Sequence, residues 1–426
     1  MKLVKTNQSP TKVTLAIDAD AAELEQIKKH VLNHFADRVQ VPGFRGGRAP
    51  AHLIEKNANQ QELANDFLEH AINELFQRAV RQENLRPVGQ PNVSLKKFVP
   101  YTVVSFEAEL EVVGAVKLAA YKTIKLAKPK ITVTAEDVNG VLKSLQKRMA
   151  ERLDVERAAK NDDELTIDFA GKDEKGAPVA GADGKDYALV LGSKTFIPGF
   201  EENLIGLKAG DKKEFDVTFP KDYGVAALQS KKVSFSVTVK KVSELVEPKL
   251  DDEFAAKSGT FKTLAELKVD VKKQITSEKE FQAEQAYQNE LIQKISEKSS
   301  VEVPKILVDE QIERAEEEEK RNLMYRGQTW QEHLDSEGVT EVQHRDRQRP
   351  DAEARVKAGL ILSEISEKES IDVTPEELDT RIAVLKTQYQ DPAMQAELDK
   401  PEGRRDIASR ILTEKTITKL VDYASK

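Results

Sequence analysis

The stretch Val39-Gln40-Val41-Pro42-Gly43-Phe44-Arg45-Gly46-Gly47-Arg48-Ala49-Pro50 interrupts a helical pattern, and the organisation of the chain can be worked out from it. Proline fixes φ and glycine permits positive φ, so two prolines and three glycines in twelve residues predict a shaped, exposed turn between two helices. Such a turn would present Phe44, Arg45 and Arg48 to a partner. Guanidinium groups bind phosphates and carboxylates, and an aromatic ring adds apolar contact. The alternative is an ordinary helix-helix turn without a binding role.

The composition of the chain limits its class. A length of 426 residues exceeds one ordinary core, so two to four domains are expected. No apolar run approaches the roughly 20 residues of a membrane span, and residues 1–5 lack the apolar region of a signal peptide. These features favour the cytoplasm. The absence of cysteine excludes thiol catalysis, disulfides and thiolate metal sites.

The charge of the chain is unevenly distributed. The formal net charge is -8, so any contact with RNA must be local. Residues 246–426 carry 40 acidic and 29 basic side chains, whereas residues 114–149 carry 2 acidic and 8 basic ones. We therefore expect the basic segment to pack beside the acidic helices. The acidic run at 316–319 predicts a solvated helix face.

The first 113 residues predict a small α+β domain. Residues 11–18 and 101–113 alternate apolar and polar side chains, as half-buried strands do. Apolar positions at helical spacing predict a helix over 21–38 and a helix-rich stretch over 50–84. The apolar stripe of the second stretch consists of Leu63, Phe67, Ala71, Leu75 and Ala79. The glycine-rich turn then joins the two halves of a helical hairpin.

The rest of the chain changes character twice. A capping box at Thr134-Ala135-Glu136-Asp137 predicts a helix whose apolar positions include Val138, Val141 and Leu142. Residues 163–242 predict short strands, with turns at 175–178 and 181–184. Helices resume after Pro248, and further capping boxes begin at three threonines, Thr263, Thr329 and Thr374. A β-rich domain is therefore inserted into a helical one.

The glycine-rich turn resembles a known signature. Its pattern Gly-Phe-Arg-x-Gly-x-x-Pro, over residues 43–50, is similar to the ribosome-binding signature of the bacterial trigger factor family. The resemblance implies a chaperone that meets nascent chains at the exit tunnel, where it contacts a large-subunit protein and rRNA. The resemblance is also compatible with a homodimer away from the ribosome, and it implies no contact with a membrane. Gly46 stands where the family usually has a basic residue. The implied ribosome-binding residues are Gly43, Phe44, Arg45, Gly46, Gly47, Arg48 and Pro50.

Residues 150–245 resemble an FKBP-type peptidyl-prolyl isomerase, on the motifs at 167–171, 196–201 and 219–224. Rotation about an X-Pro bond has a barrier of about 18–20 kcal/mol because of amide resonance, and no covalent step is needed to lower it. An apolar cup that excludes water favours the twisted, less dipolar amide. Val179-Ala180 stands where many such domains have an aromatic residue and an acid. The resemblance implies a cup of Phe169, Phe196, Ile197, Phe200, Tyr223 and Phe235, with Tyr187 at its edge.

Other candidate sites are weaker. His30 and His34 have a metal-compatible i, i+4 spacing, but no third ligand is near in the sequence, so we expect surface or packing roles. No metal, nucleotide or other cofactor is expected. Exposed apolar positions of the helical region would bind unfolded chains. Candidates for that surface, which could equally be core, are Leu323, Met324, Tyr325, Leu360, Ile361 and Leu362.

The sequence as a whole predicts a multidomain α+β protein in three parts. Residues 1–113 form the ribosome-binding domain, 150–245 the isomerase domain, and 114–149 with 246–426 a linker and a helical substrate-binding domain. The expected function is that of an ATP-independent, ribosome-associated chaperone with prolyl isomerase activity. A free cytosolic prolyl isomerase and a non-ribosomal holdase are the alternatives.

Overall fold

The structure is a computed structural model that describes residues 1–36, 39, 41–42, 44, 50–173, 175–221, 223, 228–389 and 391–425. The chain divides into two compact units. The first comprises residues 1–127, 288–322 and 345–426, and the second comprises residues 128–287 and 323–344. Each unit is described by itself.

The first unit begins with a four-stranded antiparallel sheet of order β1-β2-β4-β3. Its strands are β1 (Lys2–Ser9), β2 (Lys12–Asp20), β3 (Pro87–Val99) and β4 (Val103–Val112). In the register, Ile17 of β2 lies opposite Phe106 of β4, and both side chains are buried. The predicted strands at 11–18 and 101–113 are thus confirmed. The sequence did not predict β1 and β3, because these outer strands are largely exposed and lack a regular apolar alternation.

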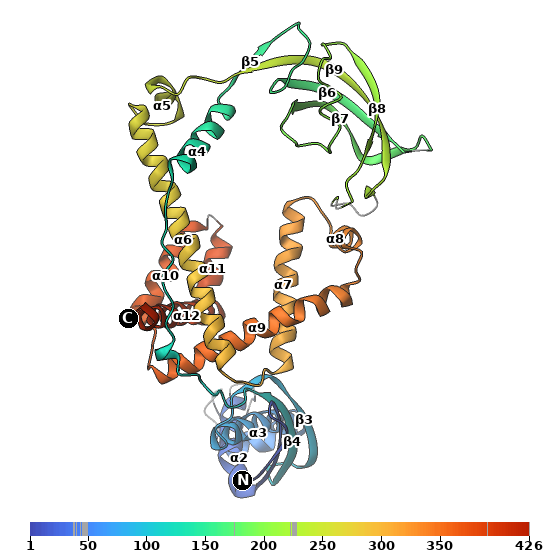
Figure 1. Ribbon diagram of the computed structural model, residues 1–426. Coiled ribbons are helices and arrows are strands. Elements are labelled where there is room, and N and C mark those ends of the chain that lie inside the picture. The colour runs from blue at the N-terminus through green and yellow to red at the C-terminus, as the bar shows by residue number, and fades with distance from the viewer. Residues whose placement is uncertain are drawn as a thin grey trace. The chain divides into compact units, whose positions relative to one another are not determined.

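Helices α1 (Ala21–Phe35) and α3 (Gln60–Gln82) pack on the sheet, and the short α2 (Ala51–Asn57) packs on α1 (Figure 1). The side chain of Asp20 caps α1, and that of Asn59 caps α3. The stripe of α3 that the sequence predicted, from Leu63 to Ala79, is fully buried in the core of this domain. The predicted α+β arrangement with a helical hairpin is confirmed for the described residues.

The remainder of the first unit is helical. It contains the C-terminal part of α6 (Leu264–Lys298), most of α7 (Lys305–Tyr325) and of α9 (Glu341–Lys368), then α10 (Pro375–Gln388), α11 (Pro392–Asp399) and α12 (Pro401–Ser425). The basic segment after β4 contacts these helices, as predicted. Lys117 pairs with Ser300 in an isolated β-bridge, and Lys122 Nζ lies 2.7 Å from Glu369 Oε1.

The second unit contains an antiparallel sheet whose strands differ in length. It also contains a small helical core that includes α4 (Ala135–Arg148). The sheet consists of β5 (Glu151–Asp154), β6 (Glu164–Lys172), β7 (Pro178–Val190) and β9 (Lys232–Val246) in the order β5-β9-β6-β7, and β8 (Lys212–Thr218) pairs with β9. Thr134 and Asp137 form the predicted capping box of α4. Leu142 of α4 packs with Phe254 of α5 (Asp252–Ser258) and Leu267 of α6.

Two details of the sequence prediction were wrong. Residues 181–184 lie within strand β7 rather than in a turn. Glu316 of the acidic run is buried, and its carboxylate accepts a 3.1 Å hydrogen bond from Arg345.

The apolar helical positions named from the sequence differ in exposure. Val141 of α4 is exposed. Of the positions that were candidates for either a client surface or the core, Leu323, Ile361 and Leu362 are buried, whereas Met324 and Tyr325 are exposed.

Among the described residues, none of the helices is both long enough and apolar enough to cross a bilayer.

Candidate functional site

The glycine-rich segment follows α1 directly. Val39 N–H donates to the Phe35 carbonyl over 3.1 Å, and Phe44 N–H donates to the Val41 carbonyl over the same distance. Val41 is buried against the domain core, whereas the Phe44 side chain is 45% exposed. Pro50 is the N-cap residue of α2. The other residues of the predicted ribosome-binding set, Gly43, Arg45, Gly46, Gly47 and Arg48, lie outside the described residues.

Aromatic side chains from four parts of the second unit meet in one cluster. Phe169 comes from β6, Tyr187 from β7, Phe235 from β9, and Phe196 and Phe200 from the segment between β7 and β8. The rings of Phe196 and Phe200 stack with centroids 4.3 Å apart. Phe169 meets the Phe196 ring edge-on at 5.3 Å, and Phe200 meets Phe235 at 5.1 Å. The two edge-on contacts lie in the range of favourable aromatic pairs, and the stacked pair is slightly closer.

The cluster has a buried floor and a more exposed side. Phe200 and Phe235 are buried, Phe169 and Phe196 are half-buried, and Tyr187 is 39% exposed. The sequence placed Tyr187 at the edge of this set, and the ring lies 5.4 Å from that of Phe196. A surface of this kind offers apolar contact to a peptide and little hydration to a bound carbonyl.

The two remaining members of the predicted cup lie beside this cluster. Ile197 is half-buried and packs against the same core. Tyr223 also packs against that core, but its ring contact is with Phe219, at 4.7 Å. Within the described part of the chain, no ring contact joins Tyr223 to the other aromatic residues of the set. The structure therefore brings Phe169, Phe196, Phe200 and Phe235 together.

Glu201 holds the segment that carries Phe196, and the sequence analysis assigned it no role. Its side chain is 6% exposed, and its carboxylate accepts backbone hydrogen bonds from Gly192, Lys194 and Phe196 at 2.8, 3.2 and 3.2 Å. Burial would raise the pKa of Glu201, but these hydrogen bonds outweigh it and hold the pKa below its ordinary value. The signal in the sequence was an acid directly after the aromatic motif.

Gly184 explains why a glycine-rich stretch occurs inside a strand. A Cβ atom at Gly184 would lie 2.7 Å from the ring of Phe169, so only glycine lets β7 pass so close to that ring. The composition of 181–184 suggested a turn because glycine is common in turns. In the folded domain the glycine instead serves the packing of the aromatic cluster.

Comparison with known proteins places this geometry in a family. A family model described as "Bacterial trigger factor protein (TF)" matches residues 1–145, and the model for its C-terminus matches residues 263–422. The chain belongs to the trigger factor family. The model described as "FKBP-type peptidyl-prolyl cis-trans isomerase" matches residues 155–240, which contain the aromatic cluster of this trigger factor.

Relatives of this trigger factor extend over its whole length. The trigger factor of Carboxydothermus hydrogenoformans is 35% identical over 425 residues, covering 100% of this chain and 99% of the relative. That of Clostridioides difficile is 32% identical over 427 residues, with 100% of both chains covered. A solved structure of the trigger factor chaperone covers 100% of both chains, at 19% identity and a TM-score of 0.49.

The family assignment confirms the predicted function and fold class. The chain is a trigger factor chaperone with an FKBP-type peptidyl-prolyl isomerase domain inserted between the N- and C-terminal parts of the family. Ribosome association is implied by the family rather than by the described geometry. The aromatic cluster suits a reaction that needs exclusion of water and no covalent catalysis.

Proposed function

We propose that this trigger factor docks on the ribosome through residues 43–50 and shelters the emerging chain near the exit tunnel. The observation that carries the proposal is the signature itself, with Phe44 exposed beside the buried Val41. Arginines in such a segment suit the phosphates of rRNA or the acidic side chains of a ribosomal protein. Because the net charge is -8, the attraction must be local, and the protein would act in the cytoplasm, partly bound to ribosomes.

We further propose that the aromatic cluster receives X-Pro segments of client chains. The residues assigned to this site are Phe169, Phe196, Ile197, Phe200, Tyr223 and Phe235. A proline ring against these side chains would lose hydration at the preceding carbonyl, which favours the twisted amide over the planar one. The proximity of four of the aromatic rings supports the assignment. Tyr223, whose ring contacts that of Phe219, would add apolar surface beside these four rings.

The first unit offers a groove for less specific client binding. Helices α6, α9 and α12 line a groove of about 640 Å³. Its apolar side chains are Ile292, Ala354, Ala358, Leu362 and Ile417. Grooves with apolar walls bind apolar segments of unfolded chains, and no nucleotide is needed for such binding. We propose this groove as one client-binding surface of the helical domain.

Three functional parts follow from this proposal. Residues 1–113 serve ribosome binding, 150–245 isomerisation, and 114–149 with 246–426 client binding. Separate hydrophobic cores support the boundaries of the first two parts. One core contains residues from Val13 to Val112, and another contains residues from Ala159 to Val242.

Ribosome docking can be tested by co-sedimentation. The variant Phe44→Ala/Arg45→Ala/Gly46→Ala should pellet with ribosomes at least about tenfold less than the wild type, and wild-type binding should weaken as salt rises. Lys29→Ala is the matched control, because it removes one positive charge from an exposed helix position of the same domain. Equal pelleting of the triple variant and the wild type would refute docking through residues 43–50.

The isomerase site can be tested with a proline-containing peptide. Phe196→Ala should lower kcat/KM about tenfold, because one wall of the apolar site is lost. The control is Ile205→Ala, which removes an exposed apolar side chain of the same domain. If the two variants retained equal activity, Phe196 would have no part in the site.

A further inference from the structure

Three histidines of the N-terminal domain come together through tertiary structure. His30 and His34 lie one turn apart on α1, and His70 lies on α3. The ring of His70 is 5.9 Å from that of His30 and 6.2 Å from that of His34, measured between ring centroids. The sequence showed only the i, i+4 pair. The packing of α1 on α3 supplies the third imidazole that the sequence lacked nearby.

The ring separations are wider than those of a metal centre by a small margin. Two imidazoles that bind one tetrahedral zinc ion through nitrogens at about 2.0–2.1 Å have ring centres about 5 Å apart. The rings of His30 and His34 are therefore each about 1 Å too far from that of His70. The first two histidines are exposed, and the His70 side chain is 40% exposed. Rotation about exposed side-chain bonds can close this difference at little cost.

A carboxylate lies beside the histidines. Asp66 Oδ2, one turn before His70 on α3, is 4.0 Å from His70 Nε2. This oxygen is shielded from solvent and accepts no hydrogen bond from the described residues. A shielded carboxylate oxygen without a partner is costly, and a nearby cation would offset that cost. Metal-binding histidines commonly have such a carboxylate next to them.

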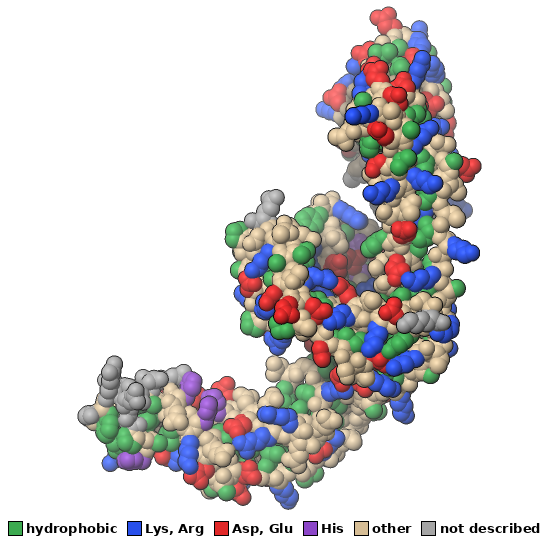
Figure 2. Space-filling model, turned by 90° about the vertical axis from the view of Figure 1, so that its left-hand side faces the viewer, with side chains coloured by type: hydrophobic (Ala, Val, Ile, Leu, Met, Phe, Trp, Pro, Cys, Tyr) green, Lys and Arg blue, Asp and Glu red, His purple; other side chains and the backbone are tan. Residues whose placement is uncertain are grey.

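We propose that His30, His34 and His70 bind one divalent transition-metal ion, with Zn²⁺ as the best fit, and that Asp66 completes or orients the site. Imidazole nitrogens favour zinc, copper and nickel, whereas Mg²⁺ and Ca²⁺ favour oxygen ligands. His34 lies in the last turn of α1, and residues 35–42 separate it from the segment proposed for ribosome docking. A bound ion would tie this end of α1 to α3. Figure 2 shows histidine side chains at the surface of this domain.

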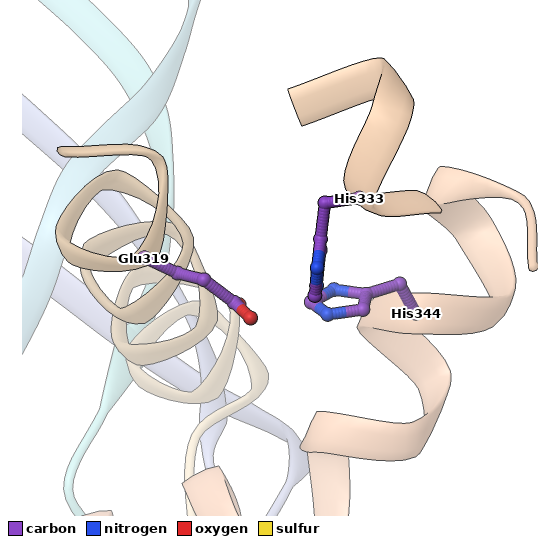
Figure 3. A group of neighbouring side chains, drawn as sticks. All are labelled: Glu319, His333 and His344. Carbon is purple, nitrogen blue, oxygen red and sulfur yellow. The ribbon is translucent and has the colours of Figure 1, made fainter. Parts of the chain in front are cut away.

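A second histidine pair has to be removed before the proposal is tested. His333 of α8 (Trp330–Glu337) and His344 of α9 lie edge to face with ring centroids 5.9 Å apart (Figure 3). This pair belongs to the second unit and could bind metal by itself. The background for all measurements is therefore the full-length chain with His333→Gln/His344→Gln, freed of metal by a chelator.

The test is a titration of this background with Zn²⁺ in competition with a chromogenic chelator. We expect one bound ion, and adding His70→Gln should lower the affinity by at least about 10- to 100-fold, since even loss of an outer partner of a ligand has that effect. His52→Gln, which removes an exposed histidine of α2, should leave the affinity unchanged. The proposal is overturned if the background binds no Zn²⁺ or if His70→Gln binds it equally well.

Hydrogen exchange gives a second readout. An ion that joins two helices should slow exchange in residues 30–36 and 66–72 together, and His70→Gln should abolish both effects. Slowing confined to α1 would mean that only the His30/His34 pair binds, which would contradict a site shared with α3. All the substituted side chains except His344 retain some exposure, so we expect the variants to fold. Far-UV circular dichroism of each variant checks this.

Discussion

At the scale of single residues, the aromatic cluster depends on two residues outside the cluster, Glu201 and Gly184. Glu201 fixes the backbone that carries Phe196, and Gly184 leaves room for the ring of Phe169. Both position rings of the cluster that we propose as the isomerase site. An acid and a glycine therefore set the geometry of this apolar cluster.

We predict that Glu201→Gln loosens the segment from Gly192 to Phe196. Loss of charged hydrogen bonds from a buried carboxylate costs about 2 kcal/mol, which corresponds to about 30-fold faster hydrogen exchange in this segment. Activity toward proline peptides should fall as well. Glu202→Gln is the matched control, since the Glu202 side chain is exposed and accepts only the Gly199 N–H among the described residues. Equal exchange in both variants would contradict the role of Glu201.

The same carboxylate predicts a pH dependence. The folded-state pKa of Glu201 is lowered, so its stabilisation is present above the unfolded-state pKa of about 4.3 and is lost as pH falls through the folded-state value. The excess protection of the wild type over Glu201→Gln, corrected for intrinsic exchange rates, should be full at pH 7 and shrink below about pH 4. A difference that stayed constant to pH 3 would argue against ionisation as its source.

At the scale of elements, Glu369 joins three parts of the first unit. It follows α9 directly, and its carboxylate accepts hydrogen bonds from Tyr121 of η1 (Tyr121–Thr123) at 2.6 Å and from Tyr423 of α12 at 2.8 Å. Lys122 and Lys419 pair with the same group. The hydrogen bonds from Lys122 and Tyr121 hold the pKa of Glu369 far below its ordinary value. The basic segment after β4 is thereby fastened to the helical domain.

We predict that Glu369→Gln weakens this junction by about 2 kcal/mol, because the partners of a nearly buried charge are left without it. Hydrogen exchange should rise in residues 117–125 and in the C-terminal turns of α12. The control is Glu367→Gln, whose side chain is 57% exposed and pairs with Arg86. Unchanged exchange at 117–125 in Glu369→Gln would show that the junction is held by other contacts.

At the scale of the whole molecule, the isomerase domain is an insertion whose two ends meet. Glu151 at the start of β5 lies opposite Val246 at the end of β9 in the antiparallel register. Such partners have Cα atoms about 5 Å apart. Just outside this pair, Gln146 donates a 2.8 Å hydrogen bond to the Pro248 carbonyl. The chain therefore enters and leaves the domain at one place, as an inserted domain requires.

We predict that residues 151–246 can be replaced by a short Gly-Ser linker without unfolding the rest, because the linker spans only the distance between paired strands. The shortened chain should keep its helical circular dichroism and its co-sedimentation with ribosomes, and it should lose prolyl isomerase activity. Loss of helicity would mean that α4 and α5 depend on the inserted domain. Retained isomerase activity would place the catalytic site elsewhere.

The sequence by itself determined the parts of this protein that repeat a local pattern. Alternation identified β2 and β4, helical spacing identified α3, and the capping boxes at Thr134, Thr329 and Thr374 are present as predicted. These features depend on neighbours in the chain, which a sequence shows directly. The order of motifs also indicated the family and the aromatic set.

Only the tertiary structure decided what depends on distant neighbours. The composition of residues 181–184 indicated a turn, but in the structure the ring of Phe169 lies against Gly184. The acidic run indicated that Glu316 is solvated, but its carboxylate lies beside Arg345. His70 joins His30 because two helices pack, not because of any spacing in the chain. Burial, ion pairing and ligand sets are properties of three-dimensional contacts, and a local pattern does not specify which distant side chain supplies the partner.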